Sequence, residues 1–237
     1  MTLVNAWIRG NAVHLMSDGV EYSPLGIALT PAQKIFTFGP MRTALACRGV
    51  SALVPSLGLA IYNRFSCFDS LVDEIGSLTR EVIEGAAQIN PALADEPFEL
   101  VVAGWSDADD APDLAMVLNT GPHPWMPLEC GDTVCSPGDP DAVQSWASAG
   151  IDPTAADFDP LTEGVRLAEA QRRITAHVPG TSGRVALIGG ALELVSITRE
   201  DVRSRVLKRW PDRIGEKISL EANAPVARIP HYSALQA

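Results

Sequence analysis

The stretch TLVNAWIRGNAVHLMSDG, residues 2–19, alternates apolar side chains with others on both sides of Gly10-Asn11. Alternation with a period of two predicts strands, and a Gly-Asn pair between two such runs predicts a hairpin turn. The chain is therefore expected to begin with a β-hairpin formed by Thr2–Arg9 and Ala12–Asp18. A second strand pair is predicted in QKIFTFGPMRTALACRG, residues 33–49, where Gly39-Pro40 separates the two runs.

The remainder of the chain predicts further strands, with helices placed between groups of them. Helices are expected over 50–65, from 66 to beyond 82, from 140, from 160 to 177 and over 199–210. Strands are expected over 98–105, 114–119, 125–134, 184–188, 191–198 and near 218, with 184–188 and 191–198 paired around Gly189-Gly190. Strands grouped in hairpins and helices inserted in pairs indicate antiparallel sheets covered by helices, an α+β layered fold.

Helix starts are expected at three side chains that accept hydrogen bonds from backbone amides. Ser66 is predicted to cap the second helix, and Asp139 and Asp159 to cap helices that begin with the prolines following them. Residues 1–237 show no internal repeat or linker and are interpreted as one domain, with an extended Pro-rich tail at 222–237.

Composition and charge narrow the classes of protein and partner. The chain has 237 residues, 46% of them hydrophobic, and 18 Lys and Arg against 29 Asp and Glu, a net charge of −11. An acidic chain with no Lys/Arg-rich run lacks the cationic surface that nucleic acids and anionic lipids require. The longest uncharged stretch, 49–63, is too short to span a bilayer, and residues 1–10 do not resemble a signal peptide. We therefore expect a cytoplasmic protein with no nucleic-acid or membrane partner.

Metal and cofactor chemistry receive no support from the sequence. The cysteines and histidines show no zinc-binding spacing, which favours reduced, structural thiols at positions 47, 67, 130 and 135. The acidic segment Asp107–Asp113 lacks the Gly and distal Glu of a calcium loop and is interpreted as a solvated turn. No cofactor or metal is therefore expected.

Three residues near the start of the chain have the chemistry of an N-terminal nucleophile. Removal of Met1 would leave Thr2 with a free α-amine beside its hydroxyl, and such an amine can accept the hydroxyl proton near neutral pH. A nearby lysine such as Lys34 would disfavour protonation of that amine and stabilise developing negative charge on the threonine oxygen. Asp18 could hold the lysine in place. Taken singly, each residue also has an ordinary structural interpretation.

The spacing of these residues resembles that of the proteasome β-subunit family, which includes the HslUV-type bacterial peptidases. Asp18 follows Thr2 by 16 residues and Lys34 follows it by 32, as in that family, with strand-turn-strand segments between them. The resemblance implies the fold of an N-terminal nucleophile (Ntn) hydrolase: a four-layer αββα sandwich of two antiparallel sheets flanked by helix pairs. It covers nearly the whole chain, although only the first 50 residues carry specific motifs.

The resemblance also implies roles for individual residues. Thr2 would be the nucleophile with its own α-amine as base, and Lys34 and Asp18 would support it. The backbone N–H of Arg48 or Gly49 would stabilise the oxyanion, and Ser136 would be the supporting serine. Ala32, Phe36 and Cys47 would line an apolar side-chain pocket. The acidic and serine residues that many members place before the later Gly-Gly are replaced here by Val185 and Ile188.

The function implied is that of a threonine peptidase that hydrolyses peptides or unfolded proteins inside a homo-oligomeric ring. Some relatives are fed by an ATPase unfoldase, and nothing in this sequence indicates whether such a partner exists here. Two alternatives remain open: an Ntn amidase that acts on a small molecule, and a catalytically inactive ring or scaffold subunit.

Overall fold

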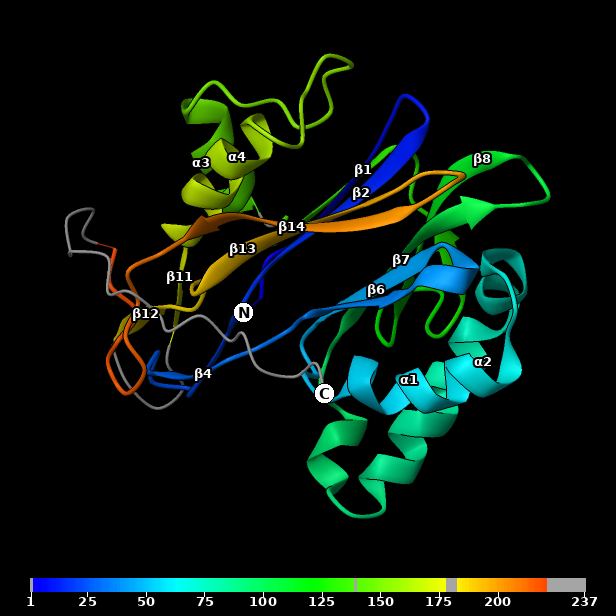
Figure 1. Ribbon diagram of the computed structural model, residues 1–237. Coiled ribbons are helices and arrows are strands. Elements are labelled where there is room, and N and C mark those ends of the chain that lie inside the picture. Colours follow the sequence, from blue (N-terminus) through cyan, green and yellow to red (C-terminus); the bar gives the residue numbers. More distant parts are fainter. Residues whose placement is uncertain (1, 139, 178–182, 221–237) are drawn as a thin grey trace, which may run out of the picture.

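Two five-stranded antiparallel sheets stacked face to face form the centre of the computed structural model, which describes residues 2–138, 140–177 and 183–220 (Figure 1). The first sheet has the strand order β10-β1-β2-β13-β14 and the second has β5-β6-β7-β8-β9. The strands of the first sheet are β1 (Val4–Arg9), β2 (Ala12–Asp18), β10 (Thr133–Ser136), β13 (Ala191–Ile197) and β14 (Val202–Arg209). Those of the second are β5 (Ile35–Phe38), β6 (Thr43–Arg48), β7 (Glu99–Ser106), β8 (Ala111–Leu118) and β9 (Pro127–Glu129).

Helices cover the outer face of each sheet (Figure 1). In the figure, α3 and α4 lie over the first sheet and α1 and α2 under the second. The helices are α1 (Leu53–Arg64), α2 (Phe68–Ala87), α3 (Pro140–Ser148) and α4 (Glu163–Arg172). The layers therefore run helix, sheet, sheet, helix, and the expected α+β αββα sandwich is confirmed.

The alternation in the first hairpin sorts its side chains between two apolar cores. Leu3 and Trp7 pack against the α3 and α4 layer, whereas Val4 and Ala6 lie in the core between the sheets. Successive side chains of a strand point to opposite faces, so a strand buried on both faces supplies both cores. A third core joins α1 and α2 to the second sheet. The hairpin that begins the chain thus lies inside the sandwich.

The first two helices lie close to their predicted positions. Pro55 falls in the first turn of α1, where a missing backbone N–H costs no helical hydrogen bond. Phe68, Leu71, Ile75 and Leu78 form one buried apolar stripe along α2. The predicted Ser66 cap is wrong because α2 begins at Phe68 and no side chain caps it. The carboxylate of Asp69 instead accepts backbone amides of the β7–β8 turn.

Segment 199–210 forms β14, and the prediction of a helix there is wrong. Its Arg- and Lys-rich sequence matches ordinary helix composition, but β13 offers it a partner strand across the turn that follows Ile197. Segment 125–134 was expected to be one strand and instead contributes to two, β9 in the second sheet and β10 in the first. The crossing between sheets needs a turn, which Gly131 supplies at a φ of +61°.

Three further expectations need correction. Segments 184–188 and 191–198 do not pair with each other, because β12 (Arg184–Ala186) pairs with β11 (Thr175–His177) whereas β13 pairs with β2 and β14. The helix predicted from Pro160 begins instead at Glu163, and Asp159 caps the turn before it by accepting the amide of Leu161. The strand expected near residue 218 is an isolated bridge between Ile27 and Lys217. The predicted cap at 139 and the tail at 222–237 lie outside the described residues.

Short elements close the end of the sandwich near the start of β1. Strand β3 (Val20–Tyr22) pairs with β4 (Ala28–Pro31), and these lie near β11 and β12 (Figure 1). A small apolar cluster of Val20, Ala28, Ala186 and Ile218 joins them. Two 3₁₀ helices, Gly39–Met41 and Pro91–Ala94, complete the elements of the described part of the chain. None of its described helices is both long enough and apolar enough to cross a membrane.

Candidate active site

Thr2, Asp18 and Lys34 meet at this end of the first sheet. The Lys34 ammonium donates a hydrogen bond of 2.9 Å to Asp18 Oδ2 and one of 3.3 Å to Thr2 Oγ1. Thr2 is 8% exposed and Asp18 is 1% exposed, so the three groups interact in a largely water-excluded space. The arrangement places a cation directly at the threonine oxygen.

Asp18 also fixes the backbone that carries Thr2. Its Oδ1 accepts the Leu3 amide at 3.0 Å and its Oδ2 accepts the Gly189 amide at 3.2 Å. The hydroxyl of Ser17 donates to the Leu3 carbonyl oxygen at 2.7 Å. A buried carboxylate is tolerated when its oxygens are satisfied in this way. One carboxylate thus orients both the lysine and the peptide unit that follows Thr2.

Local backbone contacts bring Lys34 to this position. Lys34 directly precedes β5, and the turn before it is tied down because Ala32 donates its amide to the Gly19 carbonyl at 3.1 Å. Gly19 in turn donates its amide to the Gly189 carbonyl at 3.1 Å. The Lys34 ammonium also lies 5.6 Å from the centre of the Tyr22 ring, within the range of a cation–π contact.

A cavity of about 60 Å³ opens beside Thr2 and Lys34. Ala32, Phe36 and Cys47 line it, as the sequence predicts. The remaining lining residues are Glu21, Gln33, Ser51, Val54 and Pro55. Burial, with a smaller contribution from Glu99, raises the pKa of the Cys47 thiol to about 12, so that thiol is an uncharged wall rather than a nucleophile at neutral pH. The wall is mainly apolar and leaves room for a small group.

Gly49 occupies a position that another residue could not take without strain. Its φ is +106°, and a Cβ there would lie 2.3 Å from the Pro97 carbonyl oxygen. Gly49 and Arg48 line a neighbouring hollow together with Tyr22 rather than the cavity beside Thr2. The role of either backbone N–H in an oxyanion hole stays a prediction.

Ser136 lies in the strand next to β1, but its hydroxyl points to Glu99 rather than to Thr2. Ser136 is paired with Val4 across the β1–β10 ladder, and its hydroxyl donates to Glu99. The other oxygen of Glu99 accepts from Arg48 at 2.6 Å. The backbone amide of Ser136 donates to the Asn5 side-chain oxygen at 3.2 Å. The structure thus groups Ser136 with an Arg–Glu pair, and its role as the supporting serine stays a prediction.

The structure adds Gly189 to the residues that the sequence singled out, since its amide binds Asp18 from 171 positions away. In the sequence, the Gly189-Gly190 pair marks a break between strands and corresponds to the later Gly-Gly of the family it resembles, and neither observation predicts a contact with Asp18. Two buried charged residues near this loop, Arg172 and Asp212, form an ion pair. No motif in the sequence singles them out, because Arg172 ends an ordinary helix and Asp212 lies in a loop.

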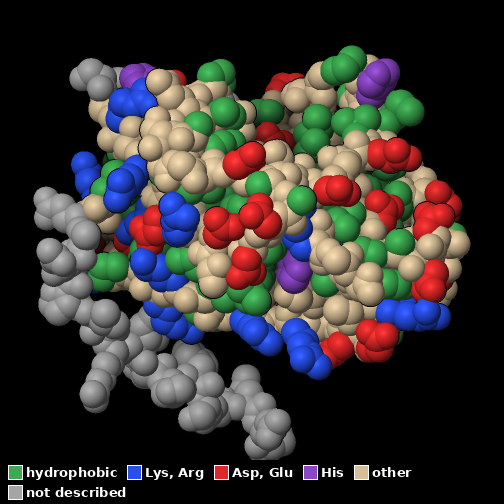
Figure 2. Space-filling view, turned by 90° about the horizontal axis from the view of Figure 1, so that it is seen from above, with side chains coloured by type: hydrophobic (Ala, Val, Ile, Leu, Met, Phe, Trp, Pro, Cys, Tyr) green, Lys and Arg blue, Asp and Glu red, His purple; other side chains and the backbone are tan. Residues whose placement is uncertain are grey.

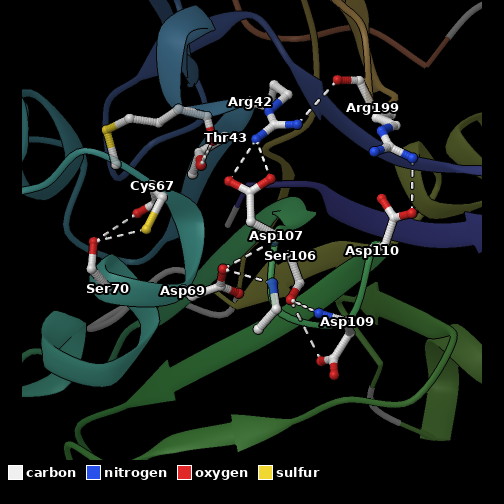
Figure 3. Close-up of polar contacts among 12 residues, drawn as sticks. Arg42, Thr43, Cys67, Asp69, Ser70, Ser106, Asp107, Asp109, Asp110 and Arg199 are labelled. Atoms are coloured by element: carbon white, nitrogen blue, oxygen red, sulfur yellow. Dashed lines mark hydrogen bonds and ion pairs between the residues drawn. The ribbon is translucent and has the colours of Figure 1, made fainter.

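Residues 107–110 of the acidic segment form the β7–β8 turn, whereas Asp113 lies in β8, and the turn bonds to two arginines and to Asp69 (Figure 3). The Arg42 guanidinium holds both carboxylate oxygens of Asp107, at 2.5 and 2.7 Å, and donates to the Arg199 carbonyl at 3.2 Å. Arg199 itself donates to Asp110 at 2.8 Å. These exposed contacts tie the turns of the two sheets together. No group of residues suited to hold a metal ion occurs in the described part of the chain.

Figure 2 shows the face of the molecule that points upward in Figure 1, on the side of α3 and α4. Asp and Glu side chains spread over its centre and right, whereas Lys and Arg lie mainly at its left and lower edges. This face therefore offers no continuous basic track to a phosphate backbone.

Comparison with known proteins supports the fold. No protein-family model matches the chain, and no curated protein does. Among solved structures, the chain is similar to the Anbu (Gly-1) mutant from Hyphomicrobium sp. strain MC1, with a TM-score of 0.57, 12% identity and coverage of 87% of each chain. Anbu is a proteasome-like protein related to the Ntn hydrolases. At this identity the likeness shows the fold alone, so the resemblance seen in the sequence holds at the level of a proteasome-like fold.

Proposed function

We propose that this protein with a proteasome-like fold is a threonine-type amide hydrolase in which Thr2, freed by removal of Met1, is the nucleophile. The observation that carries the proposal is the position of Lys34, whose ammonium lies 3.3 Å from Thr2 Oγ1 and 2.9 Å from Asp18 Oδ2. A cation held at the threonine oxygen by a buried carboxylate stabilises the charge that develops there during attack.

The proposed reaction needs no group beyond the chain itself and water. The Thr2 oxygen attacks the substrate carbonyl carbon while the α-amine of Thr2 takes the hydroxyl proton. The tetrahedral oxyanion is held by the backbone N–H of Arg48 or Gly49 and then collapses, which breaks the C–N bond. The leaving amine takes the proton from the α-ammonium. Water then attacks the resulting ester with the α-amine as base, and the acid product and free Thr2 are released.

The cavity beside Thr2 favours a small apolar group on the acyl side of the cleaved bond. Its volume of about 60 Å³ is bounded by Phe36 and the uncharged Cys47 thiol. An extended peptide could pair with the edge of β3, as strand addition places alternate side chains into pockets. We therefore propose a peptide substrate with an Ala-sized residue at this position. The same small volume also favours the second candidate, hydrolysis of a small amide.

We further propose that the chain assembles into a homo-oligomer. Proteasome-like proteins form rings, and the fold of this chain is similar to theirs. The mass of the native particle, measured by mass photometry at several concentrations, would be a multiple of 25.2 kDa. A particle that stays monomeric at all concentrations would contradict this proposal and leave the chemistry of Thr2 to be judged separately.

The decisive experiment is intact mass spectrometry before and after treatment with a peptide epoxyketone, which reacts with both the hydroxyl and the amine of an N-terminal threonine. We expect a mass without Met1 and one added inhibitor per chain. Thr2→Ser, which keeps a hydroxyl and a small residue after Met1, is the matched control and should still react. Thr2→Ala should not react. A native protein that retains Met1, or that lacks Met1 and does not react, would exclude the peptidase and favour a scaffold subunit.

Turnover then separates the two hydrolase candidates. Hydrolysis of short peptides with Ala before the cleaved bond would support the peptidase. Hydrolysis of small N-acyl amides with no cleavage of those peptides would support the small-molecule amidase instead.

A further inference from the structure

A buried ion pair lies on the α4 side of the first sheet, behind the loop that contacts Asp18. The Arg172 and Asp212 side chains are 5% and 3% exposed, and they meet through two hydrogen bonds of 2.6 and 2.9 Å. A buried ion pair is weak evidence of stability on its own, since desolvation of both charges offsets their attraction. The position of this pair therefore needs another reason.

The remaining contacts of Arg172 anchor it firmly. Its guanidinium donates to the Ile188 carbonyl at 2.6 Å and to the Ser219 carbonyl at 2.8 Å, and it lies 4.8 Å from the centre of the Trp210 ring. A planar guanidinium that donates this many hydrogen bonds is held in a single orientation. Arg172 thus fixes the position of Asp212 and of the loop that begins at Ile188.

The pair is linked to the candidate active site through two consecutive backbone amides. Asp212 Oδ2 accepts the Gly190 amide at 2.8 Å. The preceding amide, that of Gly189, donates to Asp18 Oδ2 at 3.2 Å, and the same oxygen accepts from Lys34 at 2.9 Å. Two buried carboxylates therefore hold neighbouring peptide units, one on each side of the loop.

Close packing makes this loop sensitive to the ion pair. A Cβ added to Gly189 would lie 2.5 Å from Asp212 Oδ2 and 3.0 Å from an Arg172 nitrogen. A Cβ added to Gly190, whose φ is +77°, would lie 2.6 Å from the Gly19 carbonyl oxygen. The loop is thus in contact on both sides, and a shift of the pair is transmitted to the Gly189 amide.

The residue before Arg172 on α4 contacts the nucleophile strand itself. The Gln171 and Asn5 side chains exchange two hydrogen bonds of 2.7 and 3.0 Å, and both are fully buried. Asn5 is three residues from Thr2. The last turn of α4 therefore reaches the strand that carries Thr2 through Gln171 and the loop that holds Asp18 through Arg172.

We infer that Arg172 and Asp212 are positioning residues, which hold the Gly189 amide against Asp18 and so keep the Lys34 ammonium at Thr2. The inference rests on the proposed function of Thr2 as nucleophile. It assigns no contact with substrate to either residue. Its chemical consequence is that the charge of Lys34 acts on the Thr2 hydroxyl and α-amine only while the ion pair is intact.

The test compares Asp212→Asn with the wild-type protein lacking Met1, using the rate of epoxyketone modification as a function of pH. Loss of the charge that anchors Arg172 should let Lys34 move from Thr2, and misplacement of this kind costs on the order of tenfold to a hundredfold in rate. The pH midpoint of the rate should also rise, because a distant ammonium no longer lowers the pKa of the Thr2 amine. A purely structural role would leave that midpoint in place.

Glu163→Gln is the matched control on the same helix. Glu163 lies at the start of α4, where it accepts the Asp159 amide at 3.0 Å and lies 3.9 Å from Arg166. It should change neither the rate nor the midpoint. Gly189→Ala is the second test variant, in case Asp212→Asn does not fold. Its Cβ displaces the loop without removing a charge, and it should reproduce the slower rate and the higher midpoint.

Amide hydrogen exchange at Leu3 separates failure of this inference from failure of the proposed function. The Leu3 amide binds Asp18 at 3.0 Å, so it should exchange faster in Asp212→Asn than in Glu163→Gln. If the wild type reacts but the rate, the midpoint and Leu3 exchange are unchanged in Asp212→Asn and Gly189→Ala, the positioning role is overturned and the nucleophile stands. If the wild type does not react, the proposed function fails, and exchange at Leu3 alone decides: faster exchange supports the positioning role and equal exchange overturns it.

Discussion

Removal of the Asp18 carboxylate is expected to destabilise the protein strongly as well as to inactivate it. Asp18 accepts three hydrogen bonds, from the Lys34 ammonium and from the amides of Leu3 and Gly189. Its side chain is fully buried, and that of Lys34 is 11% exposed. The substitution Asp18→Ala therefore leaves one mostly buried cation and two backbone donors without their acceptor.

The expected magnitude follows from these contacts. Removing one partner of a buried ion pair costs about 3–5 kcal/mol, and each buried donor left unsatisfied costs about 1–3 kcal/mol. The two costs overlap because the same carboxylate serves all three donors, so we expect a loss of at least about 3 kcal/mol in the free energy of unfolding. For a chain of this size such a loss lowers the melting temperature by roughly 6–12 °C.

Urea denaturation at one protein concentration measures this loss, with thermal melting as a second probe. Asp18→Asn keeps an acceptor and should lose less, and Asp18→Asn combined with Lys34→Met should lose less than the sum of the single changes. The control is Glu84→Ala, which breaks an ion pair with Arg80 whose side chains are 60% and 62% exposed. An Asp18→Ala variant as stable as Glu84→Ala would refute the buried arrangement from which the proposed chemistry is derived.

Three further predictions concern the helices, the first hairpin and the cavity. In α2, Gly76→Ala should lower the free energy of unfolding by about 1–3 kcal/mol, because its Cβ would lie 1.9 Å from the Trp125 carbonyl oxygen. Gly85→Ala, with open space around it, should raise the free energy of unfolding by up to about 1 kcal/mol. Urea denaturation of both variants measures this difference, and equal effects would contradict it. Burial lowers the pKa of His14 from 6.5, so the unfolded chain binds more protons below that pH and stability should fall as the solution is acidified. His14→Gln should therefore flatten the dependence of the melting temperature on pH between about pH 5 and 7. An unchanged slope would contradict the assignment of this dependence to His14. Phe36→Ala should enlarge the cavity beside Thr2. The rate of modification by a Leu-bearing epoxyketone, divided by the rate with an Ala-bearing one, should then rise on the order of tenfold. An unchanged ratio would show that the side chain on the acyl side of the inhibitor binds elsewhere.

The central residues of the candidate site were predictable because their signal is local. The alternating runs around Gly10-Asn11 define a hairpin whose length places Asp18 beside the start of β1. The β3–β4 pair then turns the chain back, so that Lys34, just before β5, lies beside Asp18. Strand period and turn residues account for the position of Asp18, whereas Lys34 was identified by its spacing from Thr2, which resembles that of the proteasome β-subunit family.

The errors arose where long-range pairing decides the structure. Five of the eight residues 202–209 are polar and three of these are arginines, a composition that suits an exposed helix and an exposed outer strand equally well. Only the presence of β13 selects the strand. The same reason explains why the sequence does not reveal that segment 125–134 crosses from one sheet to the other: β9 pairs with the preceding strand β8, but β10 pairs with β1, which lies far away in the sequence.

The supporting residues could not be predicted for a related reason. Arg172 lies 40 positions from Asp212, and Gly189 lies 171 positions from Asp18. No periodic pattern or motif in a single sequence links residues so distant. Their burial in the folded chain, rather than their type, distinguishes them from the exposed charges of the same acidic protein.

If Thr2 is the nucleophile as proposed, the geometry places a condition on when it becomes reactive. Thr2 is next to the first residue of the sequence, whereas the Gly189 amide that binds Asp18 comes from the loop before β13. That loop in turn contacts Arg172, at the end of α4, and Asp212. An unfolded or incomplete chain has the same amine and hydroxyl but no ammonium fixed beside them. The threonine should therefore gain its reactivity only after the segment around Asp212 has packed against the first sheet, which couples activation of the nucleophile to completion of the fold.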